Sequence, residues 1–455
     1  MQKHSPASDL TTGSPLSRIF IFALPLVFGT LFQQLYNFAD TVIIGRFLGE
    51  NALAAVGVTY SLNFLILGFV QGCAVGFGVP VSHAFGAKEP QEVHRYYWNG
   101  LWLSAVISVV FMLFTVALTV PLLRLIHTPV SILDTAAVYI RIIFAGIPLS
   151  MLSNHSASVL RALGDSRHPF YFLLISCALN IALDYLLVAV IPCGVAGAAI
   201  ATILSQGISG LLNCWWLFTK TDGFSVRRKE VCFSPSHAKQ LCLIGLPMGF
   251  EYSVSAVGAV IMQNAINGLG QTAIAAQTTG EKIRQMFTLP MESVGMAMAT
   301  YTAQNHGARR PDRIRSGIRS GLTIQYLYCI ASWLVIFLSK KSLVALVLGE
   351  AVSPTALGAL DYLTRISALF AVHGSLMIFR NALQGMGYSF QAILSGAGEL
   401  AGRSLGAALA AGGLGFTAIC YANPVSWAFA LCYCAVMVAL HLRRPDKNNG
   451  KAKSI

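Results

Sequence analysis

The sequence predicts an all-α membrane protein that crosses the lipid bilayer about twelve times. Of its 455 residues, 55% are hydrophobic and only 11% are charged. That is too little polar material to cover a water-soluble globule of this size. Apolar runs long enough to cross about 30 Å of hydrocarbon recur along the whole chain. We therefore expect a polytopic helical fold with no separate soluble domain.

Each long apolar run is interpreted as one membrane helix. The expected spans are 16–45, 52–80, 97–124, 132–158, 168–191, 194–219, 238–267, 272–303, 318–339, 355–383, 389–412 and 415–442. The stretch Met1–Ser17 lacks the cationic start, short apolar core and small-residue cleavage site of a signal peptide. The first span is therefore expected to stay in the mature protein.

The excess of basic residues predicts topology. With the N-terminus in the cytoplasm, most lysines and arginines, including Arg380, fall on the cytoplasmic side. The only ones assigned to the outer side are Arg46, Arg124, Lys340 and Lys341. This is the positive-inside pattern, and an even number of spans returns both termini to the cytoplasm. The formal charge of +13 therefore does not indicate nucleic-acid binding.

The ten cysteines form no CxxC pair and no zinc-like cluster, so we expect neither a metal site nor structural disulfides. Most lie within apolar runs, where a cysteine behaves as a small hydrophobic residue. The glycines between Gly72 and Gly78 are expected to form a surface for close helix packing.

An internal repeat divides the chain into two halves. The segment from Pro25 to Val93 recurs from Pro247 to Ile314, and Leu160–Ser166 recurs as Leu383–Ser389. Six spans thus repeat as six, which predicts two pseudo-symmetric, parallel lobes around a central cavity. The expected organisation is an N-lobe (1–218), a cytoplasmic linker (219–237), a C-lobe (238–442) and a cytoplasmic tail (443–455). Such lobes suit transport by alternating access.

Several motifs resemble those of one transporter family. They are Leu35–Thr41 with Gly45–Gly49 and Ala52–Gly57, Arg161–Arg167 with Pro169, Leu289-Pro290, and Gln304–Ala308 with Arg313. Together with the repeat and topology, they are similar to the multidrug and toxic compound extrusion (MATE) family, which belongs to the MOP superfamily. The resemblance implies export of bulky, cationic or amphipathic compounds in exchange for H⁺ or Na⁺, without a cofactor.

Asp40 and Asp184 are the candidate coupling residues. A carboxylate within the hydrocarbon costs roughly 2.5–3.5 kcal/mol on insertion scales, so it is expected to have a function. Both aspartates are expected roughly 10 Å below the outer boundary, where they can share one site. Two close carboxylates in a low dielectric do not both ionise cheaply, so the pair should take up a proton or hold a sodium ion. The alternative is a structural hydrogen-bonding role.

Neighbouring polar residues complete the predicted coupling site. Tyr36 and Asn180 precede the two aspartates by four residues and so share their helix faces. Thr202 is expected at a comparable depth. The resemblance also implies that this N-lobe pattern binds the coupling ion and nearby substrate. Pro25 removes a backbone hydrogen bond and can act as a hinge of the first span, or form a static kink.

Further polar residues are candidates for the substrate cavity. They are Gln33, Gln34, Asn37, Asn154, Glu251, Glu281 and Arg403. Glu399 and Arg403 stand four residues apart and should neutralise each other. Some family branches bind the ion in the C-lobe through a glutamate and an aspartate. Here the tenth span offers only Asp361, near its outer start, and His373, so a complete C-lobe ion site is doubtful.

Two rival functions are weighed against antiport. A flippase for lipid-linked precursors, in the same superfamily, would need cationic residues in its cavity, and the sequence offers Arg403 and few others. A membrane-embedded enzyme would need a motif such as HExxH or GxSxG, and neither is present. No phosphate-binding loop is present, so ATP is not expected to drive the protein directly. The expected partners are small-molecule substrates and membrane lipid, in a monomeric protein of the bacterial inner membrane.

Overall fold

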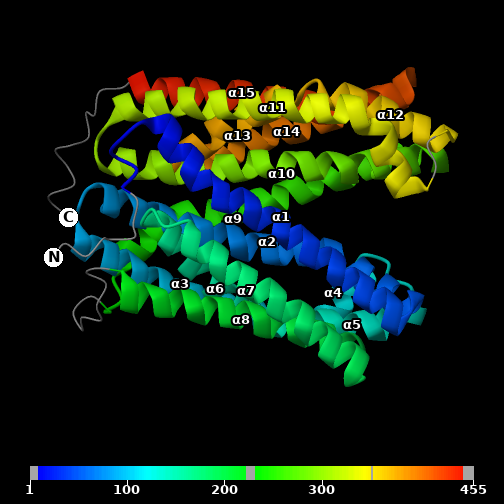
Figure 1. The fold of residues 1–455 in the computed structure, drawn as a ribbon, viewed down its shortest axis with the longest axis horizontal. Coiled ribbons are helices and arrows are strands. Elements are labelled where there is room, and N and C mark those ends of the chain that lie inside the picture. Colours follow the sequence, from blue (N-terminus) through cyan, green and yellow to red (C-terminus); the bar gives the residue numbers. More distant parts are fainter. Residues whose placement is uncertain (1–8, 222–230, 350–351, 444–455) are drawn as a thin grey trace. The chain divides into compact units, whose positions relative to one another are not determined.

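The computed structural model describes residues 9–221, 231–349 and 352–443, and these ranges contain helices but no β-strand (Figure 1). In chain order, with η marking π-helix, they form α1 (Pro15–Leu48), α2 (Glu50–Gly86), α3 (Pro90–Ala117), α4 (Thr119–Leu125), α5 (Val130–Ala145), α6 (Ile147–Ala162), α7 (Arg167–Asp184), η1 (Tyr185–Val190), α8 (Gly194–Lys220), α9 (Pro235–Asn267), α10 (Gln271–Gly307), α11 (Pro311–Leu348), α12 (Pro354–Ser367), α13 (Phe370–Gly385), α14 (Ser389–Leu409), η2 (Ala410–Leu414) and α15 (Gly415–Arg443).

Each predicted span corresponds to one helix or to one pair of consecutive segments. Within the described residues, seven helices are long and apolar enough to cross a membrane, or up to nine if each of two bent pairs is one span. The stretch Ser389–Arg443 counts once in that test although it contains α14 and α15. The predicted all-helical, polytopic fold is therefore confirmed. Most of the predicted linker and tail fall on residues 222–230 and 444–455, outside the described ranges.

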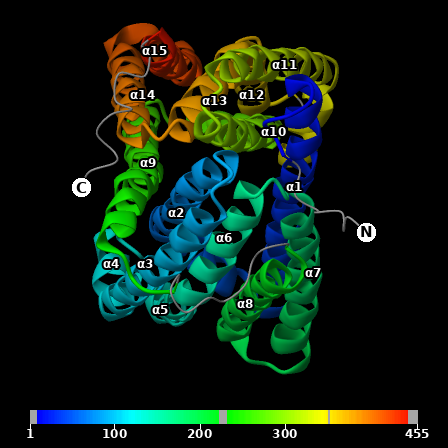
Figure 2. The same ribbon diagram turned by 90° about the vertical axis from the view of Figure 1, so that its left-hand side faces the viewer.

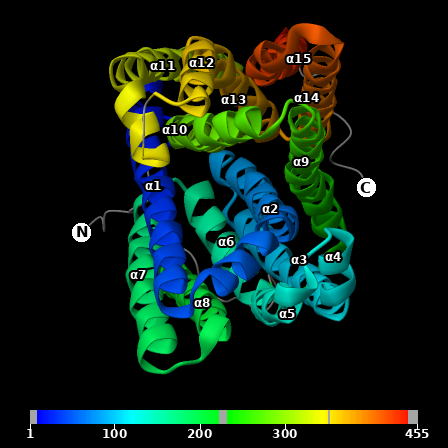
Figure 3. The same ribbon diagram turned by 90° about the vertical axis from the view of Figure 1, so that its right-hand side faces the viewer.

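The chain forms two compact units. Unit 1 comprises Met1–Thr12 and Phe20–Ala256, and unit 2 comprises Gly13–Ile19 and Val257–Ile455. In unit 1, α6 packs against α2, α3 and α8, whereas in unit 2, α13 packs against α10, α11 and α15 (Figures 2 and 3). The counterpart of α6 in the sequence repeat is therefore also a helix with several packing partners.

The two halves repeat the same local backbone geometry. The pair α5 and α6 bends by 45°, and its counterpart α12 and α13 bends by 50°. Gly49 precedes α2 with φ 81°, and Gly270 precedes α10 with φ 89°. Glycine adopts this positive φ without steric cost, which explains why the repeat has glycine at both positions. The predicted six-plus-six repeat therefore extends to individual turns.

Both halves also contain a π-helical segment. Segment η1 begins directly after Asp184, and η2 follows α14. The alignment of Leu160 with Leu383 brings η1 and η2 to overlapping positions. A π-helix bonds each N–H five residues back, so the turn is wider than in an α-helix, and such turns occur often at functional sites.

Helices α2 and α9 approach each other closely within unit 1. A Cβ atom on Gly76 would lie 2.5 Å from Gly245 Cα, and one on Gly72 would lie 2.5 Å from the Met248 carbonyl oxygen. Real Cβ atoms do not approach other atoms so closely, so the backbones can touch because glycine has no side chain. The predicted close-packing role of the Gly72–Gly78 stretch is confirmed.

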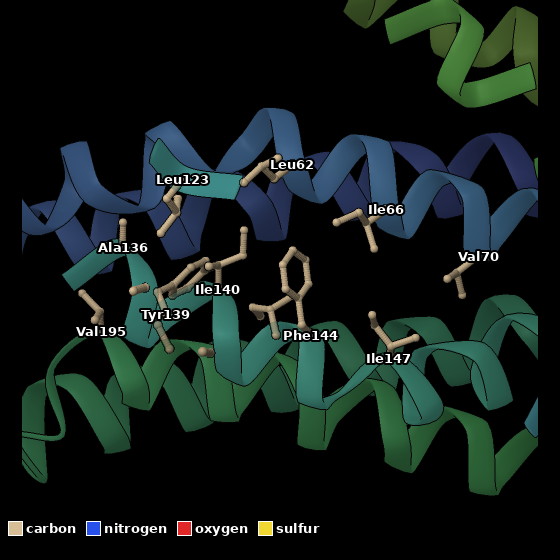
Figure 4. Close-up of a cluster of buried hydrophobic side chains, with 14 of the residues drawn as sticks. Leu62, Ile66, Val70, Leu123, Ala136, Tyr139, Ile140, Phe144, Ile147 and Val195 are labelled. Atoms are coloured by element: carbon tan, nitrogen blue, oxygen red, sulfur yellow. The ribbon is translucent and has the colours of Figure 1, made fainter. Parts of the chain in front are cut away.

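The core of unit 1 holds α5 in place (Figure 4). Leu62, Ile66 and Val70 recur at four-residue intervals, so they share one face of α2, and all three are buried. The same core includes these residues of α5 and α6: Ile140, Phe144 and Ile147. Tyr139 of α5 also belongs to it. The core thereby fixes a helix whose tyrosine interacts with the candidate site described next.

Candidate functional site: a buried carboxylate pair

The two aspartates predicted from the sequence lie near each other in unit 1. Asp184 is the last residue of α7 and is completely buried, whereas Asp40 lies on α1 and is half-buried. Their carboxyl groups are close enough for their charges to interact. The structure therefore brings together two acidic groups that are far apart in the sequence.

Helix α1 contacts α7 through small and aromatic residues. The Cβ position of Gly29 is 3.2 Å from a methyl carbon of Leu173. The rings of Phe32 and Phe170 are 6.2 Å apart between centroids. Because Gly29 and Phe32 precede Asp40 on α1, these contacts help to place its carboxyl group near α7.

Oxygen atoms of the site lack internal partners. Asn180 lies one turn before Asp184, and its Nδ2 donates to Thr202 Oγ1 at 3.5 Å. Asn180 Oδ1, both carboxylate oxygens of Asp184 and Oδ1 of Asp40 are buried without a hydrogen-bond partner in the described part of the chain. A buried acceptor left unpaired costs about 1–3 kcal/mol. The site thus presents several buried oxygens to a proton or a hard cation.

Two tyrosines complete the site. Tyr36 precedes Asp40 by one turn on α1, and its hydroxyl interacts electrostatically with both aspartates. Tyr139 of α5 does the same. Sequence reasoning found Tyr36 through its spacing from Asp40 but missed Tyr139, which has no polar neighbour at helical spacing to distinguish it from other tyrosines.

The remaining N-lobe candidates are dispersed. Gln33, Gln34 and Asn37 are exposed on α1, and Gln33 interacts with Tyr36. Asn154 lies on α6, where its Nδ2 donates to the Ser150 carbonyl oxygen at 2.9 Å. These residues are accessible or bonded locally, so the structure does not join them into one site. Pro25 lies in the interior of α1 and Glu251 is half-buried on α9, also in unit 1.

Unit 2 contains a separate network of charged side chains, which begins on α10. Glu281 accepts hydrogen bonds from Arg284 Nε at 2.8 Å and Nη2 at 2.5 Å. The Tyr362 hydroxyl of α12 donates to Glu281 at 2.6 Å. Glu281, proposed from the sequence as a cavity residue, is thus bound to Arg284, which sequence reasoning did not consider.

The same network continues on α13 and α14. Glu399 accepts a short hydrogen bond from Arg380 and a second one from Arg403 at 3.4 Å. The predicted contact between Glu399 and Arg403 is therefore confirmed. The use of Arg380 as a topogenic cytoplasmic charge is wrong, because its side chain is buried and paired with Glu399 and Ser395. Its charge therefore carries no information on which side of the membrane the helix ends.

Other acidic groups of the second half do not form an ion site. Asp361 accepts from Arg365 Nε at 2.8 Å on the same helix. Among the residues that the structure describes, no group of three or more His, Cys, Asp or Glu side chains is placed to hold a metal ion.

The helical repeat and the buried charges within its spans define a polytopic membrane transporter. The profile of the MatE family matches residues 25–186 and 247–397, and these stretches begin at Pro25 and Pro247, the prolines aligned by the internal repeat. The chain belongs to this family, which is the multidrug and toxic compound extrusion family suggested by its motifs.

Known proteins agree with this assignment. The chain is 29% identical over 309 residues to the probable multidrug resistance protein YpnP of Bacillus subtilis, covering 68% of this chain and 69% of YpnP. It is 22% identical to an FAD transporter of Shewanella oneidensis, covering 67% and 68% of the two chains. An outward-facing MATE family multidrug resistance transporter of the MOP superfamily superposes with a TM-score of 0.90 at 20% identity, covering 98% and 100% of the chains.

Proposed function

We propose that the chain is a secondary active antiporter of the bacterial inner membrane that exports cationic or amphipathic small molecules in exchange for H⁺ or Na⁺. The observation that carries the proposal is the pair Asp40 and Asp184, with buried oxygens that have no partner in the described chain. The name of YpnP, a probable multidrug resistance protein, supports drug export. Both termini are placed in the cytoplasm by the charge pattern of the sequence.

Coupling follows from competition for the same carboxylates. A proton or sodium ion entering from outside neutralises the repulsion between Asp40 and Asp184, with Asn180, Tyr36 and Thr202 as further oxygen ligands or hydrogen-bond partners. Neutralisation weakens the hold on a cationic substrate, which leaves, and the loaded carrier returns to the inward-open state. Alternating access between pseudo-symmetric lobes supplies the movement.

Ion-driven uptake into everted vesicles tests this proposal. Asp40→Asn and Asp184→Asn remove one negative charge each without changing side-chain size, and each should reduce uptake of a fluorescent cation at least tenfold. Asp361→Asn is the matched control, because Asp361 is held by Arg365 on the surface of α12. Uptake by both site variants at the wild-type rate would refute the proposal.

Ionophores identify the coupling ion. If protons drive transport, collapsing the pH gradient stops uptake and a sodium gradient does not restore it. If sodium drives transport, a sodium gradient alone sustains uptake. Uptake that depends on neither gradient would contradict antiport.

The substrate class is a separate matter. One relative is named for multidrug resistance and another as an FAD transporter, so the family name does not define the cargo. A flippase for lipid-linked precursors would hold a strongly anionic head group on cationic residues. Arg284, Arg380 and Arg403 are each bonded to a carboxylate, which argues against a site for several negative charges.

A further inference from the structure

The charged network of unit 2 is not used by the proposed coupling site. Three arginines, Arg284 of α10, Arg380 of α13 and Arg403 of α14, extend from three helices, and α13 lies against both α10 and α14 (Figure 1). Arg380 is 7% exposed, and the side chains of Arg284 and Arg403 are each 14% exposed. Three nearly buried guanidinium groups within one membrane unit are costly and require a compensating function.

The internal ion pairs neutralise these arginines unequally. Arg284 has Glu281 as a bidentate partner. Arg380 and Arg403, in contrast, share the single carboxylate of Glu399. The pairs formed by hydrogen bonds therefore leave one positive charge in excess.

Glu292 is the carboxylate that can balance this excess. It lies on α10 eight residues after Arg284, and its charge interacts with Arg284 and Arg380. Glu292 forms no hydrogen bond or ion pair with any described residue, and its side chain is exposed. A charged side chain exposed at membrane depth faces water rather than lipid. The network is therefore open to water at Glu292, where a mobile carboxylate supplies the balancing charge.

His373 supplies an unused hydrogen-bonding group in the same place. It is 6% exposed, and neither ring nitrogen has a hydrogen-bond partner among the described residues. Its ring lies 4.7 Å from that of Trp427, and Arg284 lies 5.8 Å from the same indole. All three arginines interact electrostatically with His373. An imidazole N–H among three guanidinium groups is suited to donate to an oxyanion.

We propose that this network binds one acidic group, a carboxylate or a similar monoanion, of the exported molecule, with Arg380, Arg403 and His373 as its donors and Glu292 as the internal group that it displaces. The inference rests on the proposed export function for its meaning. It makes the substrates zwitterionic amphiphiles as well as simple cations. Positive groups of such a molecule remain free to contact other parts of the transporter.

A matched pair of dyes tests the proposal by binding alone. Rhodamine B carries a cationic xanthene and a free benzoate, whereas its ethyl ester keeps the cation and lacks the carboxylate. Binding of each dye to the purified full-length protein in nanodiscs is measured by fluorescence anisotropy, with empty nanodiscs as the blank. No ion gradient is present, so failure of antiport in the vesicle assay would leave this test intact.

Two substitutions should change rhodamine B binding in opposite directions. Arg403→Gln removes a donor and should weaken rhodamine B binding about tenfold, since a hydrogen bond to a charged group is lost. Glu292→Gln removes the competing charge without breaking any described contact, and should strengthen rhodamine B binding severalfold. The ester should change less than twofold with Arg403→Gln. Arg365→Gln, at the exposed pair with Asp361, is the control and should leave both dyes unaffected.

The outcome is decided by the ratio of the two affinities. Opposite shifts for rhodamine B in the two variants, with little change for the ester in Arg403→Gln, support the proposal. Equal losses for both dyes in Arg403→Gln would assign a structural role to the network. Weaker or unchanged rhodamine B binding in Glu292→Gln would overturn the proposal even if Arg403→Gln fails to fold. Absence of rhodamine B binding to the wild-type protein would also overturn it.

Discussion

Replacing Gly76 by alanine should force α2 and α9 apart. The new Cβ atom would lie 2.5 Å from Gly245 Cα, whereas ordinary contacts of Cβ atoms begin at 3.4 Å. The obstructing atom is backbone, so one helix must move by about 1 Å. Overpacking of this kind costs about 1–3 kcal/mol, and alanine regains about 1 kcal/mol of helix propensity. We therefore expect a net loss of roughly 1–2 kcal/mol in the free energy of unfolding.

A second glycine of α2 provides the control for this prediction. Gly57 is exposed, and a Cβ atom there would have no neighbour within 4 Å. Gly57→Ala should therefore leave stability unchanged or raise it. Thermal denaturation of both purified variants in the same detergent compares them with the wild-type protein. If Gly76→Ala melts at or above the temperature of Gly57→Ala, the contact between α2 and α9 is looser than the structure indicates, and the reasoning is refuted.

Two other changes test the charged network and the proposed hinge. Glu399→Gln leaves Arg380 and Arg403 without their shared carboxylate, which should lower stability by about 3–5 kcal/mol, whereas Arg365→Gln at an exposed pair should cost less than about 1 kcal/mol. Equal melting temperatures of these two variants would contradict the structural account. Pro25→Ala restores a backbone hydrogen bond of α1, so it should preserve or raise stability while slowing transport in everted vesicles; wild-type transport would make Pro25 a static kink.

The positions of the helices and the first site residues could be predicted because they depend on local patterns. Apolar runs of the required length marked every span, and the period of the α-helix placed Tyr36 beside Asp40 and Asn180 beside Asp184. The structure then brings Asn180 of α7 to Thr202 of α8, which agrees with their predicted common depth. The role of these residues in ion coupling stays a prediction.

The charged network of unit 2 could not be predicted in the same way. Its bonds join α10 to α12, and α13 to α14, so the partner of each charge depends on packing between helices. Arg380 shows the consequence. In the sequence it looks like any basic residue near the end of a span, and only the neighbouring α14 shows that it is paired inside the bundle.

The π-helical segments η1 and η2 bear on the history of the chain. A π turn contains one residue more than the α turn that it replaces, so it marks the place where a helix has gained a residue without losing its direction. Both halves contain such a turn at overlapping positions of the repeat. One insertion in an ancestral half, copied when the half was duplicated, accounts for both segments. Asp184 then lies at the border of an old insertion, and residues beyond it face a different direction from the one that α-helical spacing would assign.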